Sequence, residues 1–134
     1  GKTPSETSYP FMTAPLDRLR ADLGAALDRL GEALHEPKSD IVRDAAIQRF
    51  EFSFELFWKA LHERADRAAL PVVSPREALR AAFQLGLLDD DEQVFQMLED
   101  RNRTSHLYNA AMAEDVFSRL SAYHGLMSGV ATRV

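Results

Sequence analysis

The chain has 134 residues, enough for one domain with its own hydrophobic core, and it contains no cysteine. Disulfide bonds and cysteine-ligated metal sites are therefore excluded. The formal net charge of −5 at pH 7 argues against a broad nucleic-acid-binding surface, because affinity for a polyanion depends largely on Lys and Arg. No apolar stretch reaches the roughly 20 residues that cross a bilayer. We expect a soluble, cytoplasmic protein that contacts neither membrane nor DNA, with any RNA contact confined to a local cleft.

The first predicted helix follows a short N-terminal arm. Residues 1–13 contain Pro4 and Pro10 and show no periodicity, so they are predicted to be a flexible arm. A single helical domain is predicted over residues 14–127. Its first helix runs from Ala14 to His35, with apolar residues at helical spacing. These residues are Leu16, Leu19, Leu23, Leu27, Leu30 and Leu34.

A long second helix is predicted from Asp40, the expected N-cap, to about Ala68, because this stretch lacks proline and glycine. Two stripes run along it. The core stripe consists of Ile47, Phe50, Phe54, Phe57 and Leu61. An adjacent stripe, rotated by roughly 100°, consists of Glu51, Glu55, Trp58 and His62. Phe52 belongs to neither stripe.

Three further helices complete the predicted fold. Ser74-Pro75-Arg76-Glu77 has the pattern of a capping box with proline at the first helical position, and Gly86 should end that helix. The acidic run at residues 89–92 favours the start of a fourth helix. A last helix is predicted from about Ala111 to Met127, followed by a fraying tail at residues 128–134. The fold class is therefore all-α, an antiparallel bundle of four to five helices.

The segment from Glu99 to Tyr108 carries the most informative motif, Arg101-x4-His106-x-Tyr108. Arginine can bind phosphate, histidine can transfer protons near neutral pH, and a tyrosine hydroxyl can accept a transferred group. On a regular helix of about 100° per residue, His106 points roughly 140° away from Arg101. Either the helix distorts around Thr104 and Ser105, or Arg101 and His106 of two chains meet across a symmetric interface. We favour the second explanation.

The same motif resembles the Arg-x4-His-x-Tyr signature of the HEPN superfamily, and in particular its nucleotidyltransferase substrate-binding branch, which is related to HepT-type toxins. Three further blocks match that branch in the same order, namely residues 46–59, residues 74–88 and residues 97–102. Together the blocks cover most of the chain from about Asp40 onward. One departure is Phe95, at a position where the family often has tryptophan.

The resemblance implies two roles for the motif. In HEPN ribonucleases the matching arginine and histidine converge across a homodimer without a metal. By that analogy, His106 transfers the proton, Arg101 stabilises charge on phosphorus and Asn102 orients either of them. In HepT-like systems a separate minimal nucleotidyltransferase modifies the matching tyrosine, which makes Tyr108 a nucleotidyl acceptor. A tyrosine merely packed at the edge of the bundle is the alternative interpretation.

The stripe beside the core is better explained by partner contact than by chemistry. Glu51 and Glu55 share a face, but no histidine or aspartate stands at metal-ligand spacing beside them, and Glu55 precedes Lys59 in the order that favours an ion pair. We expect no metal and no cofactor. Trp58 has the amphipathic surface of an interface anchor, and Phe52 points away from the core. We therefore predict a partner or dimer interface at Trp58, Glu51, Glu55 and Phe52.

The chain lacks a glycine-rich phosphate loop, and it lacks the Gly-Ser pair followed by paired aspartates that a nucleotidyltransferase site needs, so it is not expected to be the transferase itself. The first hypothesis is a homodimeric substrate-binding or substrate-like subunit. It would pair with a cognate minimal nucleotidyltransferase chain in a system of the toxin-antitoxin type. The alternative is a metal-independent HEPN endoribonuclease toxin, and a second alternative is a non-catalytic helical adaptor. The sequence names neither the RNA nor the nucleotide.

Overall fold

The computed structural model describes residues 15–89 and 91–134, and all regular structure in these ranges is helical. The predicted arm at residues 1–13 and Asp90 of the acidic run lie outside the described residues. The elements are α2 (Pro15–His35), α3 (Asp40–Arg67), α4 (Pro75–Gln84), α5 (Asp91–Arg103), the 3₁₀ turn η1 (Thr104–His106), α6 (Ala110–Phe117) and α7 (Leu120–Ala131).

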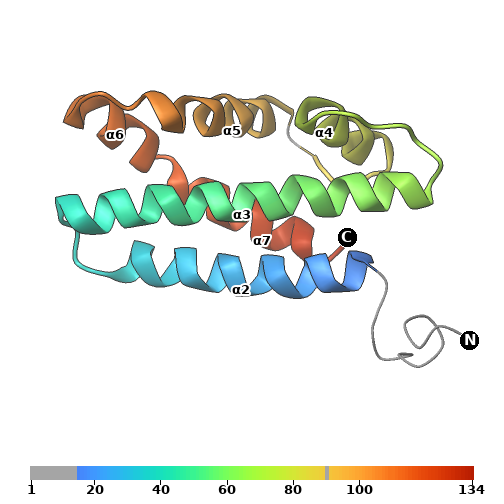
Figure 1. The fold of residues 1–134 in the computed structure, drawn as a ribbon, viewed down its shortest axis with the longest axis horizontal. Helices are drawn as coiled ribbons and strands as arrows, with labels where there is room; N and C mark the ends of the chain where they lie inside the picture. Colours follow the sequence, from blue (N-terminus) through green and yellow to red (C-terminus); the bar gives the residue numbers. More distant parts are fainter. Residues whose placement is uncertain (1–14, 90) are drawn as a thin grey trace, which may run out of the picture.

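Helix α3 is the central element of the bundle (Figure 1). Helix α2 runs antiparallel to α3 along one side, and α4, α5 and α6 lie in a row along the opposite side. Helix α7 packs against both α2 and α3. The predicted all-α antiparallel bundle is confirmed. Within the two described ranges, no helix combines the length and the apolar character needed to span a membrane.

The core forms where the predicted stripes of α2 and α3 meet. Leu23 and Leu30 of α2 are fully buried, as are Phe50 and Phe57 of α3. Burying one such side chain contributes about 1.5–3 kcal/mol. The Phe50 ring stacks on Tyr123 of α7, with 5.6 Å between the ring centroids. The core stripe predicted for the second helix is therefore confirmed, and the stacking fixes α7 against α3.

The N-terminal caps confirm one prediction and correct another. Ser74 caps α4 as predicted, by accepting a hydrogen bond from the Glu77 amide. The Glu77 carboxylate reaches back as in a capping box, but it accepts from the Val73 amide, one residue before the N-cap. For α3 the N-cap is Ser39, whose hydroxyl accepts a hydrogen bond from the Val42 amide at 3.0 Å. The prediction of Asp40 was wrong by one residue, because Asp40 is already the first residue of the helix.

Two helices end at a residue in the left-handed conformation. Gly86 follows α4 with a φ of 77°, as predicted for the residue that ends this helix. Ala69 follows α3 with a φ of 60°, although its Cβ disfavours this region. The Leu70 amide then donates to the Ala65 carbonyl, which closes the end of α3.

The C-terminal helix differs from its prediction in two respects. It is divided into α6 and α7 near Ser118, whose hydroxyl donates to the Asp115 carbonyl, a type of bond that often bends helices. The expected fraying tail is also wrong for its described residues, because α7 continues to Ala131 and Val134 is buried. Arg20 of α2 donates hydrogen bonds to the Val134 carbonyl. Packing against α2 therefore orders this segment.

Candidate functional site

The helix that carries the motif stops before its histidine. Helix α5 ends at Arg103, Thr104 to His106 form the 3₁₀ turn η1, and Asn109 caps α6 by accepting a hydrogen bond from the Met112 amide at 2.9 Å. The Thr104 hydroxyl lies 2.7 Å from the Arg101 carbonyl, so it can bond the backbone of the helix that it follows. The helix therefore does distort around Thr104 and Ser105, which was one of the two explanations considered for the motif.

Two carboxylates of α3 contact the end of α5. Glu51 lies 2.7 Å from the Thr104 hydroxyl, and Glu55 lies 3.6 Å from Nη2 of Arg101. Glu55 also accepts a hydrogen bond from the indole of Trp58 at 3.3 Å and pairs with Lys59 at 3.2 Å, as its spacing predicted. These carboxylates therefore tie the end of α5 and the turn η1 to α3.

His106 and Tyr108 form an exposed pair. Nδ1 of His106 lies 3.0 Å from the Tyr108 hydroxyl, and 79% of Tyr108 is exposed. When this nitrogen is unprotonated it can accept the phenolic proton, which is the arrangement that activates a hydroxyl nucleophile. The pair stands on the short segment between α5 and α6, where a partner can reach it.

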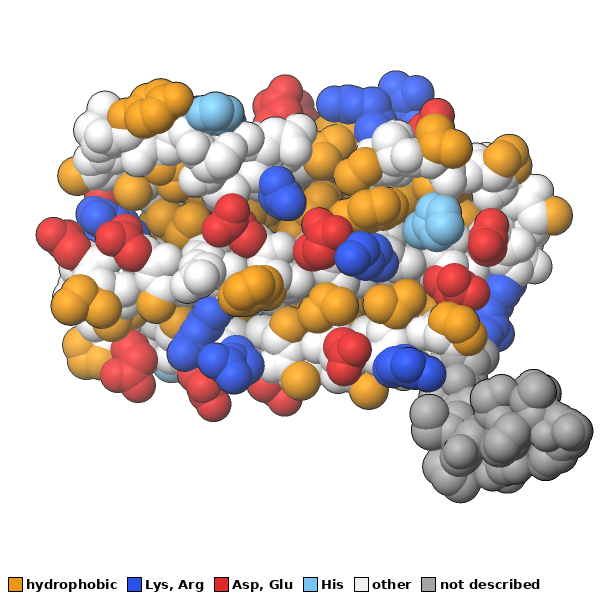
Figure 2. Space-filling model, viewed as in Figure 1, with side chains coloured by type: hydrophobic (Ala, Val, Ile, Leu, Met, Phe, Trp, Pro, Cys, Tyr) orange, Lys and Arg blue, Asp and Glu red, His pale blue; other side chains and the backbone are white. Residues whose placement is uncertain are grey.

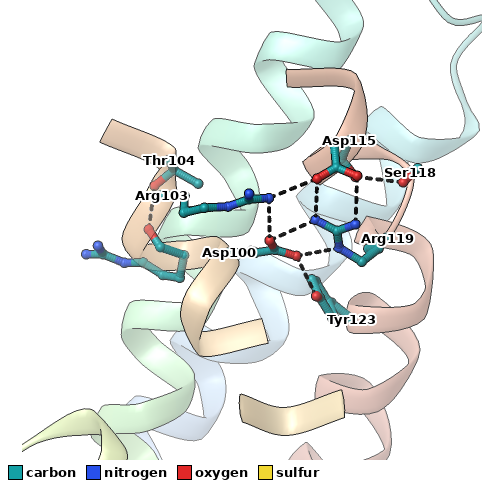
Figure 3. A network of polar contacts seen from close by, with 8 residues as sticks. Asp100, Arg103, Thr104, Asp115, Ser118, Arg119 and Tyr123 are labelled. Carbon is teal, nitrogen blue, oxygen red and sulfur yellow. Dashed lines mark hydrogen bonds and ion pairs between the residues drawn. The ribbon is translucent and has the colours of Figure 1, made fainter. Parts of the chain in front are cut away.

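A network of charged groups anchors both ends of that segment (Figure 3). The buried Asp100 of α5 accepts hydrogen bonds from Nε and Nη2 of Arg119 at 2.7 and 2.9 Å. It also accepts bonds from Arg103 at 3.0 Å and from the Tyr123 hydroxyl at 2.5 Å. Asp115 of α6 accepts further hydrogen bonds from both arginines. The network therefore links α5, α6 and α7.

The network shifts the pKa values of its members in directions that preserve it. Hydrogen bonds from Arg119 and Arg103 lower the pKa of Asp115 to about 2. The pKa of Arg119 is raised, chiefly by its hydrogen bonds with Asp100 and Asp115. Burial, together with the bond to Asp100, raises the pKa of Tyr123. Asp115 and Arg119 therefore stay charged, and Tyr123 stays protonated, throughout the neutral range.

The comparisons with known proteins decide the family. Residues 19–134 match the family described as nucleotidyltransferase substrate binding protein like. The chain belongs to this family. Among solved structures, a crystal structure of a protein from Thermus thermophilus is 42% identical and superposes with a TM-score of 0.77. The match covers 83% of this chain and 97% of that one. The search of curated proteins found no match.

Arg101 and His106 each contact another residue in this member of the nucleotidyltransferase substrate-binding family. In the part of the chain that the structure describes, no hydrogen bond joins them, because Arg101 turns to Glu55 and His106 to Tyr108. That Arg101 and His106 of two copies meet across a symmetric interface stays a prediction.

Asn102 lies on a different side of α5 from the contact between Arg101 and Glu55. It is exposed and borders a hollow of about 630 Å³ beside the charged network. The residues lining this hollow are Gln96, Glu99, Asp100, Asn102, Arg103, Asp115 and Arg119. The structure therefore places Asn102 with the network and not with the pair formed by His106 and Tyr108.

The predicted interface residues divide by exposure. Phe52 is 60% exposed, whereas Trp58 is half-buried against the core, with its ring edge-on to His62. Figure 2 shows hydrophobic, acidic and basic side chains side by side over α3 and its neighbours. This mixed face is amphipathic, as contact surfaces between proteins are. Whether it binds a partner remains a prediction.

Sequence reasoning missed the charged network. Asp115, Arg119 and Tyr123 repeat at intervals of four, which places them along one side of a helix, and this spacing was the available signal. Asp100 belongs to another helix, and a one-dimensional pattern does not report that contact. Within the described residues, no group of three acidic or histidine side chains is placed to hold a metal ion.

Proposed function

We propose that the chain is the helical substrate-binding, or substrate-like, subunit of a two-component system of the toxin-antitoxin type. It acts as a homodimer that docks a separately encoded minimal nucleotidyltransferase. The match of residues 19–134 to the nucleotidyltransferase substrate-binding family supports the choice of partner. The resemblance of the Arg101-x4-His106-x-Tyr108 motif to HepT-like proteins supports the assignment to a HEPN-type system.

The observation that carries the proposal is the exposed Tyr108 hydroxyl beside Nδ1 of His106. In the proposed reaction the Tyr108 oxygen attacks the α-phosphorus of a nucleoside triphosphate held by the partner. The bond from that phosphorus to the β-phosphate oxygen breaks, and pyrophosphate leaves. His106 takes the phenolic proton, so the products are a tyrosyl nucleotide and pyrophosphate.

The mixed face on α3 is the proposed docking surface. Phe52 supplies exposed apolar area, and Trp58, Glu51 and Glu55 border it with half-buried aromatic and acidic groups. Because Glu51 and Glu55 already contact α5, a partner bound here would also contact the helix end that carries Arg101. Docking on this face would therefore bring the transferase close to the motif.

Co-expression with the nucleotidyltransferase encoded beside it, followed by intact-mass measurement, tests the acceptor role. The wild-type chain should gain the mass of one nucleoside monophosphate. Tyr108→Phe should abolish the gain, and His106→Ala should slow it. Tyr9→Phe, a change of the same kind outside the described residues, should leave it intact. A full gain in Tyr108→Phe would show that Tyr108 is not the acceptor.

A metal-independent endoribonuclease is the second candidate. The contact between Nη2 of Arg101 and Glu55, at 3.6 Å, is too long for a hydrogen bond, and His106 is exposed. Both side chains are therefore accessible to a second copy of the chain. In this function Arg101 and His106 act on one phosphate across the dimer, and Asn102 supports them. Purified protein should then cut RNA in the presence of EDTA, and His106→Ala should not. Equal cutting by both proteins would reject it.

A further inference from the structure

A hollow of about 500 Å³ opens between α2 and α3, apart from the motif and from the charged network. Its lining residues are Ala26, Arg29, Ala45, Gln48, Arg49 and Phe52. The space exists because Ala26 of α2 and Ala45 of α3 carry no side chain beyond Cβ. Sites for small molecules typically enclose roughly 300–1,000 Å³, so the hollow has the size of such a site.

The hollow is cationic, although the chain as a whole is acidic. Two arginines and no carboxylate line it, while the net charge of the chain is −5. Arg49 donates a hydrogen bond to the Arg29 carbonyl at 2.6 Å and lies 3.7 Å from Glu32, so its guanidinium is held in place. Among the described residues, the Arg29 side chain has no hydrogen bond or ion pair. Guanidinium donors of this kind match the oxygens of a phosphate.

The wall of the hollow also includes an aromatic surface. Phe52 is 60% exposed, which is unusual for phenylalanine, and it stands on the same helix as Arg49. A phenyl face held by a helix is a platform on which a planar base can stack, whatever the base. Gln48 adds an amide that can both donate and accept hydrogen bonds.

From these features we infer that the hollow between α2 and α3 binds a mononucleotide, with its phosphate on Arg29 and Arg49 and its base on Phe52. A longer nucleic acid does not fit, because two cations on an acidic chain cannot neutralise a polyanion. This inference rests on the proposed function, from which we expect this chain to bind a ligand. Because Phe52 also belongs to the proposed docking surface, the nucleotide and the docked partner compete for its ring. Nucleotide binding in this hollow should not require the transferase, so it can be measured with the isolated chain.

Titration calorimetry of the full chain with AMP, GMP, CMP and UMP tests the inference. At least one nucleotide should bind at one site per chain, and the matching nucleoside and inorganic phosphate should each bind at least about tenfold more weakly. Arg29→Gln and Phe52→Ala should each weaken binding about tenfold or more. Ala45→Leu, which fills the hollow without changing charge, should abolish it. Arg80→Gln removes the same charge outside the hollow and should change nothing.

Three outcomes would overturn the inference. The first is that none of the four nucleotides binds in the millimolar range. The second is that binding is unchanged in both Phe52→Ala and Ala45→Leu while their thermal unfolding matches the wild type. The third, seen by light scattering, is that Ala45→Leu dissociates a dimer and leaves nucleotide binding intact, because the hollow would then be a contact between copies. A missing transferase partner would refute the proposed function and leave this measurement unaffected.

Discussion

Asp100 is predicted to be the most consequential single charge in the bundle. Its side chain is almost completely buried and accepts four hydrogen bonds, three from arginines and one from the Tyr123 hydroxyl. In Asp100→Asn an amide nitrogen replaces one carboxylate oxygen, so the two hydrogen bonds that this oxygen accepts are lost, and Arg119 loses its buried counter-charge. The change keeps the shape of the side chain, so it isolates the loss of charge and of acceptors.

The expected cost follows from the burial of the group. Removing one partner of a buried ion pair costs about 3–5 kcal/mol. Arg103 and Arg119 are partly reached by solvent, which screens the charges left behind, so we expect about 3 kcal/mol, the lower end of this range. At about 3 °C per kcal/mol for a chain of this size, the melting temperature should fall by roughly 10 °C.

Urea unfolding followed by circular dichroism measures the loss, and Asp115→Asn is the matched control. That variant makes the same chemical change in the same network at an exposed carboxylate, so its effect should be far smaller. If the two variants lose similar stability, or if Asp100→Asn loses less than about 1 kcal/mol, the argument from burial is refuted.

Three further predictions concern helix ends and pH. Ser39→Ala should cost about 1 kcal/mol of unfolding free energy because Ser39 caps α3, whereas Asp40→Ala should cost much less; equal losses in urea titrations would contradict this assignment. Ala69→Gly should raise the unfolding free energy by about 0.5–1 kcal/mol, since glycine relieves the left-handed strain; an unchanged or lower value would count against that strain. The folded-state pKa of Asp115, about 2, lies below its ordinary 3.8, so its contribution is present above pH 3.8 and lost as the pH falls towards 2. In Asp115→Asn the unfolding free energy, measured by acid titration, should therefore depend less steeply on pH between 3.8 and 2. A dependence as steep as that of the wild type would disprove this role of Asp115.

The predicted interface illustrates where reasoning from the sequence stopped. The position of Phe52 on neither stripe of α3 implied an exposed ring, and the structure shows that ring exposed. Across the hollow from Phe52, however, lie residues of another helix, Ala26 and Arg29 of α2. The spacing of residues along α3 contains no information about which side chains of α2 lie across from it.

For the motif Arg101-x4-His106-x-Tyr108, too, the sequence predicted some features and not others. Its residue types identify chemistry, and the constraint that one regular helix cannot bring Arg101 and His106 together followed from angle alone. Helix α5 does end before His106, yet Arg101 turns to Glu55. The contact of Arg101 depends on α3, which supplies the carboxylate that Arg101 faces.

The helices up to α5, the buried stripe of α3 and the serine cap of α4 could be predicted from the sequence, because these depend on residues within a few turns of one another. The contacts of Asp100 with Arg119 and Tyr123, and the packing of α7 against α2, could not be predicted in this way. Such contacts join residues distant in the chain, and their geometry depends on how whole helices pack. Side-chain periodicity shows which face of a helix is buried, but the crossing of the helices selects the partner.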